Sequence, residues 1–282
     1  MDELKNITEA LNELQGGFFK DYVYPITMAL FSTLLGAAIA YLTVRRQEHL
    51  QQEKSKLEIA NRWTLKMEEA RANLFAIKRN YHGELTAHPF QRATVIPTNP
   101  LRHKIIDEDY TGLTFIMPKK SRKGVMPYRW SQVTRIRAVL SNYNELMLIW
   151  ERRHELHDEF LLCIREDNIN HMSDGLTFEK AIELYGVDRI LRLIDNNEQA
   201  IVLTDKLLEE LTDFVVNFPH FVKTMIDMKR LKSVGTLIGY QGDTTSELSW
   251  LMQRSPQADF KTIESLVPES EAEIERRYRN LS

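Results

Sequence analysis

Residues 22–49 read YVYPITMALFSTLLGAAIAYLTVRRQEH, and residues 22–44 of this stretch contain no Asp, Glu, Lys, Arg or His. A helix of that length spans roughly 34 Å at about 1.5 Å per residue, which exceeds the ~30 Å hydrocarbon core of a bilayer. The stretch therefore predicts a transmembrane helix at residues 22–44. The competing interpretations are a buried core helix and a signal sequence. A signal sequence carries basic residues before its apolar region, whereas here Arg45 and Arg46 follow it.

The flanking lysines and arginines predict the orientation of this segment. The tail at residues 1–21 holds only Lys5 and Lys20, whereas residues 45–66 hold Arg45, Arg46, Lys54, Lys56, Arg62 and Lys66. Short segments rich in Lys and Arg remain on the cytoplasmic side of a membrane. We therefore expect a single-pass protein of the inner (plasma) membrane, with a short tail outside and the C-terminal part in the cytoplasm. The single cysteine, Cys163, fits a reducing compartment.

One face of the predicted membrane helix carries small side chains. Ser32, Gly36 and Ala40 repeat every four residues, a pattern that lets two membrane helices approach closely. The pattern predicts a homo-oligomer formed through this face within the lipid bilayer. The alternative is that these residues have no interface, because Gly, Ala and Ser are common in membrane helices.

Composition and motifs argue against several classes of function. The formal net charge is -3, so no overall positive field would recruit nucleic acid. The sequence lacks the Gly-rich phosphate loops, the nucleophile elbow and the paired cysteines or histidines of familiar enzymes and metal sites, so we expect no cofactor. Glu151 and His154 form a single Glu-x-x-His pair, whereas a di-iron bundle needs two. We therefore expect no metal site.

The residues after the membrane segment predict an all-α cytosolic bundle. Residues 45–82 read as a polar stalk that continues into the first bundle helix. The apolar residues of this helix recur every three or four positions, at Ile59, Trp63, Met67, Ala70, Leu74, Ile77 and Tyr81. Such a stripe is typical of a bundle helix. A coiled-coil seam is the alternative, although the mean spacing exceeds the 3.5 residues that a left-handed coiled coil requires.

Residues 83–129 interrupt the helical pattern. Five prolines fall in this range, so the sequence predicts a long irregular loop with one short strand at GLTFIM, residues 112–117. The loop contains the basic run KKSRK, residues 119–123. We predict contact with lipid headgroups or a phosphate-bearing partner by Lys119, Lys120, Arg122 and Lys123. The alternative is a solvated basic loop.

Residues 130–235 predict the remainder of the bundle. Helical spacing of apolar residues indicates one helix near 131–167 and another near 187–217, with a break at Pro219. A shorter helix at 177–185 has Thr177 as its expected N-cap and Gly186 as its end. Residues 236–282 are rich in Gly, Thr and Ser, and we expect an irregular segment with a short terminal helix.

Two pairs of Arg and His have a spacing found in one family of ribonucleases. Arg152 with His157, and Arg165 with His171, resemble the Arg-x(4–6)-His motif of HEPN-type ribonucleases, which are all-helical. The resemblance implies that the Arg holds a phosphate and the His transfers a proton during RNA cleavage. A chain with 8 histidines yields about two such spacings by chance, so the motif carries little weight.

The layout therefore predicts a membrane-anchored protein whose cytosolic helical domain acts by interaction. It tethers or senses an unidentified cytosolic protein partner. The layout resembles that of bacterial inner-membrane proteins, including those of phage-defence loci, which suggests a stress or antiviral setting. The first alternative is an oligomerising effector that perturbs the bilayer. The second is a membrane-tethered HEPN-like ribonuclease.

Overall fold

The computed structural model describes residues 5–9, 22–98, 105–107, 109–118, 127–166, 176–240, 246–264 and 273. Every regular element within these residues is helical, which confirms the all-α class. The chain divides into two compact units, Met1–Ser55 and Lys56–Ser282.

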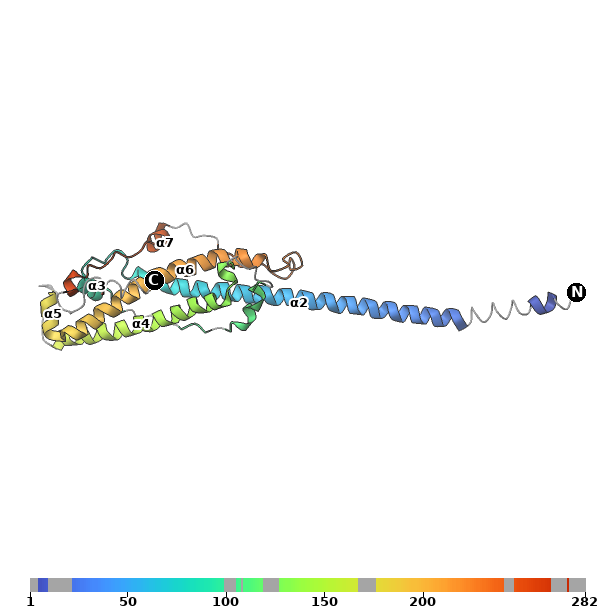
Figure 1. Cartoon of the computed structure of the whole chain (residues 1–282), viewed down its shortest axis with the longest axis horizontal. Helices are drawn as coiled ribbons and strands as arrows, with labels where there is room; N and C mark the ends of the chain where they lie inside the picture. The colour runs from blue at the N-terminus through green and yellow to red at the C-terminus, as the bar shows by residue number, and fades with distance from the viewer. Residues whose placement is uncertain are drawn as a thin grey trace. The chain divides into compact units, whose positions relative to one another are not determined.

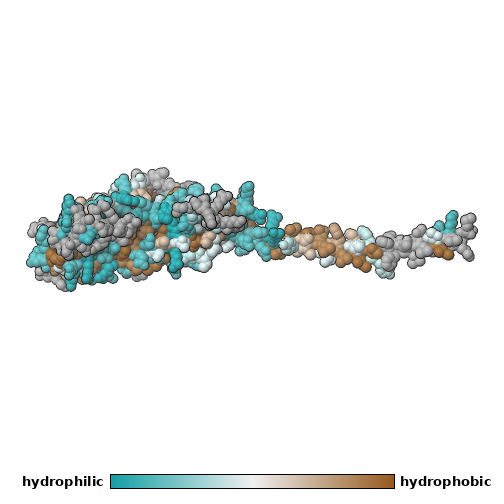
Figure 2. Space-filling model, in the orientation of Figure 1, coloured by the Kyte–Doolittle hydropathy of each residue, from teal (hydrophilic) through white to brown (hydrophobic). Residues whose placement is uncertain are grey.

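The longest element, α2 (Tyr24–Arg79), contributes to both units. Pro25 lies in its first turn, where a missing backbone N–H is tolerated. From Ala37 to Arg79 the sequence contains no Gly or Pro, and the last turn ends with the bases Lys78 and Arg79, which favour a helix C-terminus. The expected long apolar N-terminal helix is therefore present. Hydrophobic residues, drawn brown, cover its first part in Figure 2.

The second unit is built on two long helices that pack side by side (Figure 1), α4 (Val133–Glu166) and α6 (Val187–Lys223). The predicted break at Pro219 is wrong, because α6 continues through Pro219 to Lys223. A proline inside a helix costs about 3 kcal/mol. Burial of Phe218, Pro219 and Val222 in the core offsets that cost.

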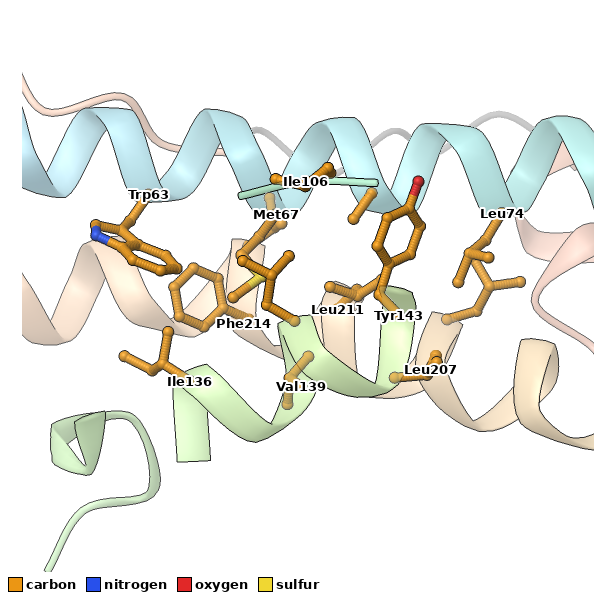
Figure 3. Close-up of a cluster of buried hydrophobic side chains, with 14 of the residues drawn as sticks. Trp63, Met67, Leu74, Ile106, Ile136, Val139, Tyr143, Leu207, Leu211 and Phe214 are labelled. Atoms are coloured by element: carbon orange, nitrogen blue, oxygen red, sulfur yellow. The ribbon is translucent and has the colours of Figure 1, made fainter. Parts of the chain in front are cut away.

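The main hydrophobic core forms where α2 packs with these two helices. Figure 3 shows side chains from α2, α4 and α6 meeting in this core, with Ile106 lying against α2. Trp63, Met67 and Leu74 are at most 1% exposed. The predicted stripe on this helix is therefore the inner face of a bundle, and the other faces of the same helix carry polar residues.

A second, smaller apolar cluster lies where the C-terminal part of α4 meets the N-terminal part of α6. It joins Phe160 of α4 and Leu193 of α6 to α3 (Pro89–Val95) and α5 (Phe178–Tyr185). The expected boundaries of α5 are confirmed. The Thr177 side chain accepts a hydrogen bond from the Lys180 backbone N–H, and Gly186 has φ 90°, a conformation that favours glycine.

The segment predicted as a long loop contains more helix than expected. Besides α3, it forms the 3₁₀ helix η2 (Thr111–Ile116), and a second 3₁₀ helix, η3 (Arg129–Ser131), begins at its last residue. The predicted strand at 112–117 is therefore wrong. Leu113 and Ile116 are both buried, and their spacing of three matches the 3₁₀ repeat. A Cβ at Gly112 would come within 3.1 Å of the Ile59 side chain, so glycine permits the close approach of η2 to α2.

The C-terminal part contains two short helices, α7 (Ser246–Leu251) and α8 (Lys261–Glu264). Residues 252–260, which lie between them and form no helix or strand, are here called the strap, and Phe260 at its end joins the second apolar cluster. The terminal helix expected after Pro268 lies outside the described residues, apart from Glu273.

Candidate functional site

The first candidate site is the apolar part of α2. By length and composition, α2 is long and apolar enough to cross a membrane, with a mean hydropathy of 1.8 over its most apolar window. None of that window is buried, which distinguishes it from the core helix of a soluble protein. Ser32, Gly36 and Ala40 are all exposed, and nothing lies within 4 Å of the position of a Cβ on Gly36. Packing within the chain therefore does not require small residues here.

The Ser and Thr hydroxyl groups of this segment are bonded within the helix. Each donates to the carbonyl oxygen four residues earlier, at 2.8 or 2.9 Å; the donors are Thr27, Ser32, Thr33 and Thr43. A polar group in hydrocarbon must find its partner inside the protein, because lipid offers none. The segment meets that requirement with its own backbone.

The second candidate site is a layer of buried polar side chains in the bundle. On α4, Arg153 and His154 fall between the two apolar clusters, as Asn197 and Glu198 do on α6. Its members are at most 9% exposed: Lys78, His82, Arg92, Arg153, His154, His157, Asn197, Glu198, Thr204 and Asp205. Buried charges on this scale must be paired or hydrogen-bonded, since desolvation alone costs several kcal/mol per ion.

Two buried ion pairs hold the strap onto the bundle. The Lys78 ammonium lies 2.7 Å from the Asp205 carboxylate and also donates to the carbonyl of Gln253 at 2.6 Å. Arg92 binds Glu198 through two nitrogens, at 2.7 and 2.8 Å. Its third nitrogen donates to a strap carbonyl, that of Pro256, at 2.7 Å. These charges therefore join α2, α3, α6 and the strap.

Arg153 is buried without a carboxylate in direct contact. One terminal nitrogen donates to the carbonyl oxygens of Ala93 and Ile96, at 2.8 and 2.5 Å. These carbonyls lie at the C-terminal end of α3, where unpaired acceptors and the helix dipole favour a cation. Burial lowers the pKa of Arg153 to about 9, with the more distant Asp158 opposing the shift. The residue therefore acts as a C-terminal cap for α3.

His157 lies one helical turn beyond Arg153, on the same side of α4. Burial first, and then the charge of Arg153, lower the pKa of His157 to about 4. Asp158 and a bond to the Thr94 backbone oppose the shift without reversing it. Its Nδ1 atom lies 3.1 Å from the hydroxyl of Thr98. The imidazole is therefore neutral at pH 7 and held inside the protein.

The Arg and His pairs singled out in the sequence do not converge. Arg152 is exposed and donates to Glu155 at 2.7 Å. His157 is 4% exposed, and a spacing of five residues turns the two side chains about 140° apart on a helix. Arg165 is exposed, and His171 lies outside the described residues.

Two other sequence predictions can be located. Glu151 is exposed, whereas His154 is buried with its ring centroid 5.9 Å from that of Trp150. Among the described residues, no group of three or more His, Cys, Asp or Glu could hold a metal ion. The basic residues Lys119, Lys120, Arg122 and Lys123 lie outside the described part of the chain.

Sequence reasoning missed the charged residues of the buried layer, although a signal was present. Four of the five stand three or four residues after a buried apolar residue on the same helix: Lys78 after Leu74, Arg153 after Trp150, Glu198 after Ile194, and Asp205 after Ile201. A charge at a stripe position indicates burial with a partner. The spacing cannot reveal which opposite charge is the partner.

Comparison with known proteins adds no functional assignment. No protein-family model, curated protein or solved structure matches the chain. Two features of the molecule itself therefore bear on its function: the exposed apolar part of α2, and the bundle with its buried polar layer.

Proposed function

We propose that the chain is a single-pass protein of the inner membrane whose cytosolic helical bundle tethers or senses a cytosolic protein partner. The observation that carries this proposal is the exposed apolar part of α2, in which all four Ser and Thr hydroxyls bond to the helix backbone. The N-terminus lies outside and the bundle lies in the cytoplasm, as the clustered bases after residue 44 favour.

The energetics of the apolar segment support membrane insertion. Leu30, Phe31 and Leu34 are 60%, 63% and 70% exposed. Moving each such side chain out of water is worth about 1.5–3 kcal/mol. Hydrocarbon can surround the Ser and Thr residues of this segment at little cost, because each of their four hydroxyls is already bonded to the helix backbone.

The buried charges of the bundle hold its segments together, and this supports an interaction role for the bundle. Lys78, Arg92 and Arg153 each hold backbone carbonyls of another segment in place. These contacts fix the architecture and leave the charges inaccessible to a substrate. A well-packed helical domain beside a membrane is suited to presenting a surface to a partner.

The structure gives less support to the two alternatives. An oligomeric pore needs polar groups facing its lumen, and the Ser and Thr hydroxyls of the apolar segment already donate to their own helix. A HEPN-like site needs an Arg and a His that face the same RNA, and Arg152 and His157 lie on different sides of α4.

Growth and membrane potential in a bacterium separate the three functions. The cells express the full chain, a version lacking residues 1–44, or the Gly36→Leu variant. If the protein acts as a tether, we expect an unchanged membrane potential with all three versions of the chain. Depolarisation that needs both the apolar segment and Gly36 would establish the bilayer-perturbing effector instead. Growth arrest that persists without residues 1–44 and disappears in His157→Ala would establish the ribonuclease.

Tethering itself is tested by the protein content of isolated membranes. Cells with the full chain are compared with cells that express the version lacking residues 1–44. We expect at least one cytosolic protein to be enriched in the membranes several-fold with the full chain and to be released with the truncated version. Identical membrane proteomes would contradict tethering.

A further inference from the structure

A cleft of about 460 Å³ opens on the surface of the second unit, on the side of α6 that faces α4 and the strap. Its apolar floor is formed by Leu203 and Leu207. The polar residues that line it come from four segments, namely Arg129 of η3, Asn142 of α4, Lys206, Glu209 and Glu210 of α6, and Arg254 of the strap. Such a site is assembled from elements far apart in sequence and depends on the folded bundle.

Two groups of ion pairs involve residues that line this cleft. Arg254 binds Glu209 through two nitrogens, at 2.7 and 2.9 Å. Glu210 accepts from Arg129 at 2.6 Å and from Arg135 at 2.8 Å, and Arg129 also donates to Asp213 at 3.2 Å. The lining carboxylates are therefore each engaged by an arginine, and neither is bonded to Lys206.

Among the described residues that line this cleft, Lys206 is the one whose charged end group has no bonded partner. Its ammonium is shielded from solvent and has no hydrogen-bond acceptor, and the Nε atom of Arg129 is shielded and unbonded in the same way. Burial, and then the nearby charge of Arg254, lower the pKa of Lys206, and Glu209 only partly opposes them. Together with the side chains that these ion pairs engage, the cleft has four cations (Arg129, Arg135, Lys206 and Arg254) against three carboxylates (Glu209, Glu210 and Asp213), so one positive charge is left over. A shielded ammonium without an acceptor is unfavourable unless an anion accompanies it.

We propose that the cleft binds a phosphate group, with Lys206 as its central contact and Arg129 as a second donor. A phosphate has three oxygens that accept hydrogen bonds from separate directions, which suits donors that arrive from α6 and η3. The apolar floor and the volume leave room for the remainder of a phosphate-bearing molecule. Its source is a soluble phosphate compound or the headgroup of a phospholipid.

Phosphate binding in this cleft does not depend on the proposed membrane anchor, because all the lining residues belong to the second unit. If the bundle senses a ligand, this cleft gives that ligand a chemical class. A negative result in the membrane experiments would contradict the anchor and not the phosphate site. Absence of phosphate binding would contradict the phosphate site and not the anchor.

Isothermal titration calorimetry of the full chain in neutral detergent tests the proposal. The probes are pyrophosphate, for soluble phosphates, and dihexanoyl phosphatidic acid, for headgroups, with succinate as a dicarboxylate control. We expect one phosphate probe to bind at least tenfold more tightly than succinate. Lys206→Met should weaken that binding at least tenfold, whereas Lys232→Met, which removes an exposed lysine, should leave it unchanged.

The probe that binds identifies the source of the phosphate. Binding of neither probe, equal binding of succinate, or unchanged binding by Lys206→Met would overturn the proposal. The melting temperature of the unliganded protein provides a folding control. Because Lys206 has no partner to lose, the melting temperature of Lys206→Met should be equal to or higher than that of the original chain.

Discussion

The two parts of α2 differ completely in their surroundings. In residues 24–44, large apolar side chains such as Phe31 and Leu34 are more than 60% exposed, whereas Trp63 and Met67 in the later part are at most 1% exposed. The difference lies in the arrangement of apolar residues. From residue 57 onward they form a stripe that one bundle face can cover. Residues 24–44 are apolar on every side, and such a helix suits a solvent that is apolar all round.

The largest expected effect comes from removing a core side chain from the later part of α2. Trp63→Ala should lower the free energy of unfolding by about 4 kcal/mol, because it leaves a cavity among α2, α4 and α6. The matched change Phe31→Ala in the exposed part should change it by less than about 0.5 kcal/mol. Thermal and urea unfolding of the full chain in detergent measures both. Equal effects would show that the two parts do not differ as described.

The two parts of α2 should also differ in their response to the removal of a charged side chain. Lys78→Met should cost about 3 kcal/mol, because it leaves the Asp205 carboxylate buried without its cation and frees the carbonyl of Gln253. Arg46→Met, at an exposed position, should cost less than about 0.5 kcal/mol. Protease cleavage at the strap provides a second reading, since loss of Lys78 should make residues 252–260 accessible earlier. A strap that stays protected would contradict the role assigned to this ion pair.

Much of this fold follows from the sequence, because its helices have strong periodicity. The apolar run, the stripe on α2, the long helices near 131–167 and 187–217, and the Thr177 cap are local signals. Two elements were predicted wrongly. At Pro219, tertiary burial outweighs the cost of a proline in a helix, and at 112–117 a six-residue apolar pattern fits both a strand and a 3₁₀ helix.

The sites were harder to predict, for a physical reason. Arg152 and Arg153 are neighbours of identical type, yet one is exposed and the other buried. The partner of Arg153 is the end of α3, a contact that requires the tertiary fold. The same holds for Lys206, whose lack of an acceptor depends on Glu209 and Glu210 being engaged by arginines from η3 and the strap.

Stability should depend on pH through the bundle, since residues 24–44 contain no Asp, Glu, Lys, Arg or His. The pKa of His157 is lowered to about 4 by burial and by Arg153, against roughly 6.5 in an unfolded chain. As pH falls below about 6.5, the unfolded state binds a proton at this histidine and the folded state does not. The free energy of unfolding therefore decreases until about pH 4. Between pH 7 and 5 we expect a loss of about 2 kcal/mol.

Urea unfolding of His157→Asn at the two pH values tests this origin. The variant should lose most of the pH dependence. His82→Asn should remove a smaller share, because the pKa of His82 is also lowered by burial but the ring lies nearer the surface. A pH dependence in His157→Asn equal to that of the original chain would assign it to other groups.

The smallest expected effect concerns the small-residue face of the exposed part. Gly36→Leu should leave the free energy of unfolding of the bundle unchanged, since nothing lies within 4 Å of a Cβ there. If two copies meet through Ser32, Gly36 and Ala40, the same change should reduce cross-linked oligomers in membranes about threefold. Unchanged cross-linking would exclude this face as an interface and leave lipid as its surroundings.

The most direct test of the account is extraction of membranes at high pH, which releases peripheral proteins and retains those that span the bilayer. Membranes from cells that express the full chain are washed at alkaline pH, and the protein is measured in pellet and supernatant, with residues 45–282 alone as the control. If residues 24–44 span the bilayer, the full chain stays in the pellet and the control is soluble. Release of the full chain into the supernatant would contradict a membrane-spanning role for residues 24–44.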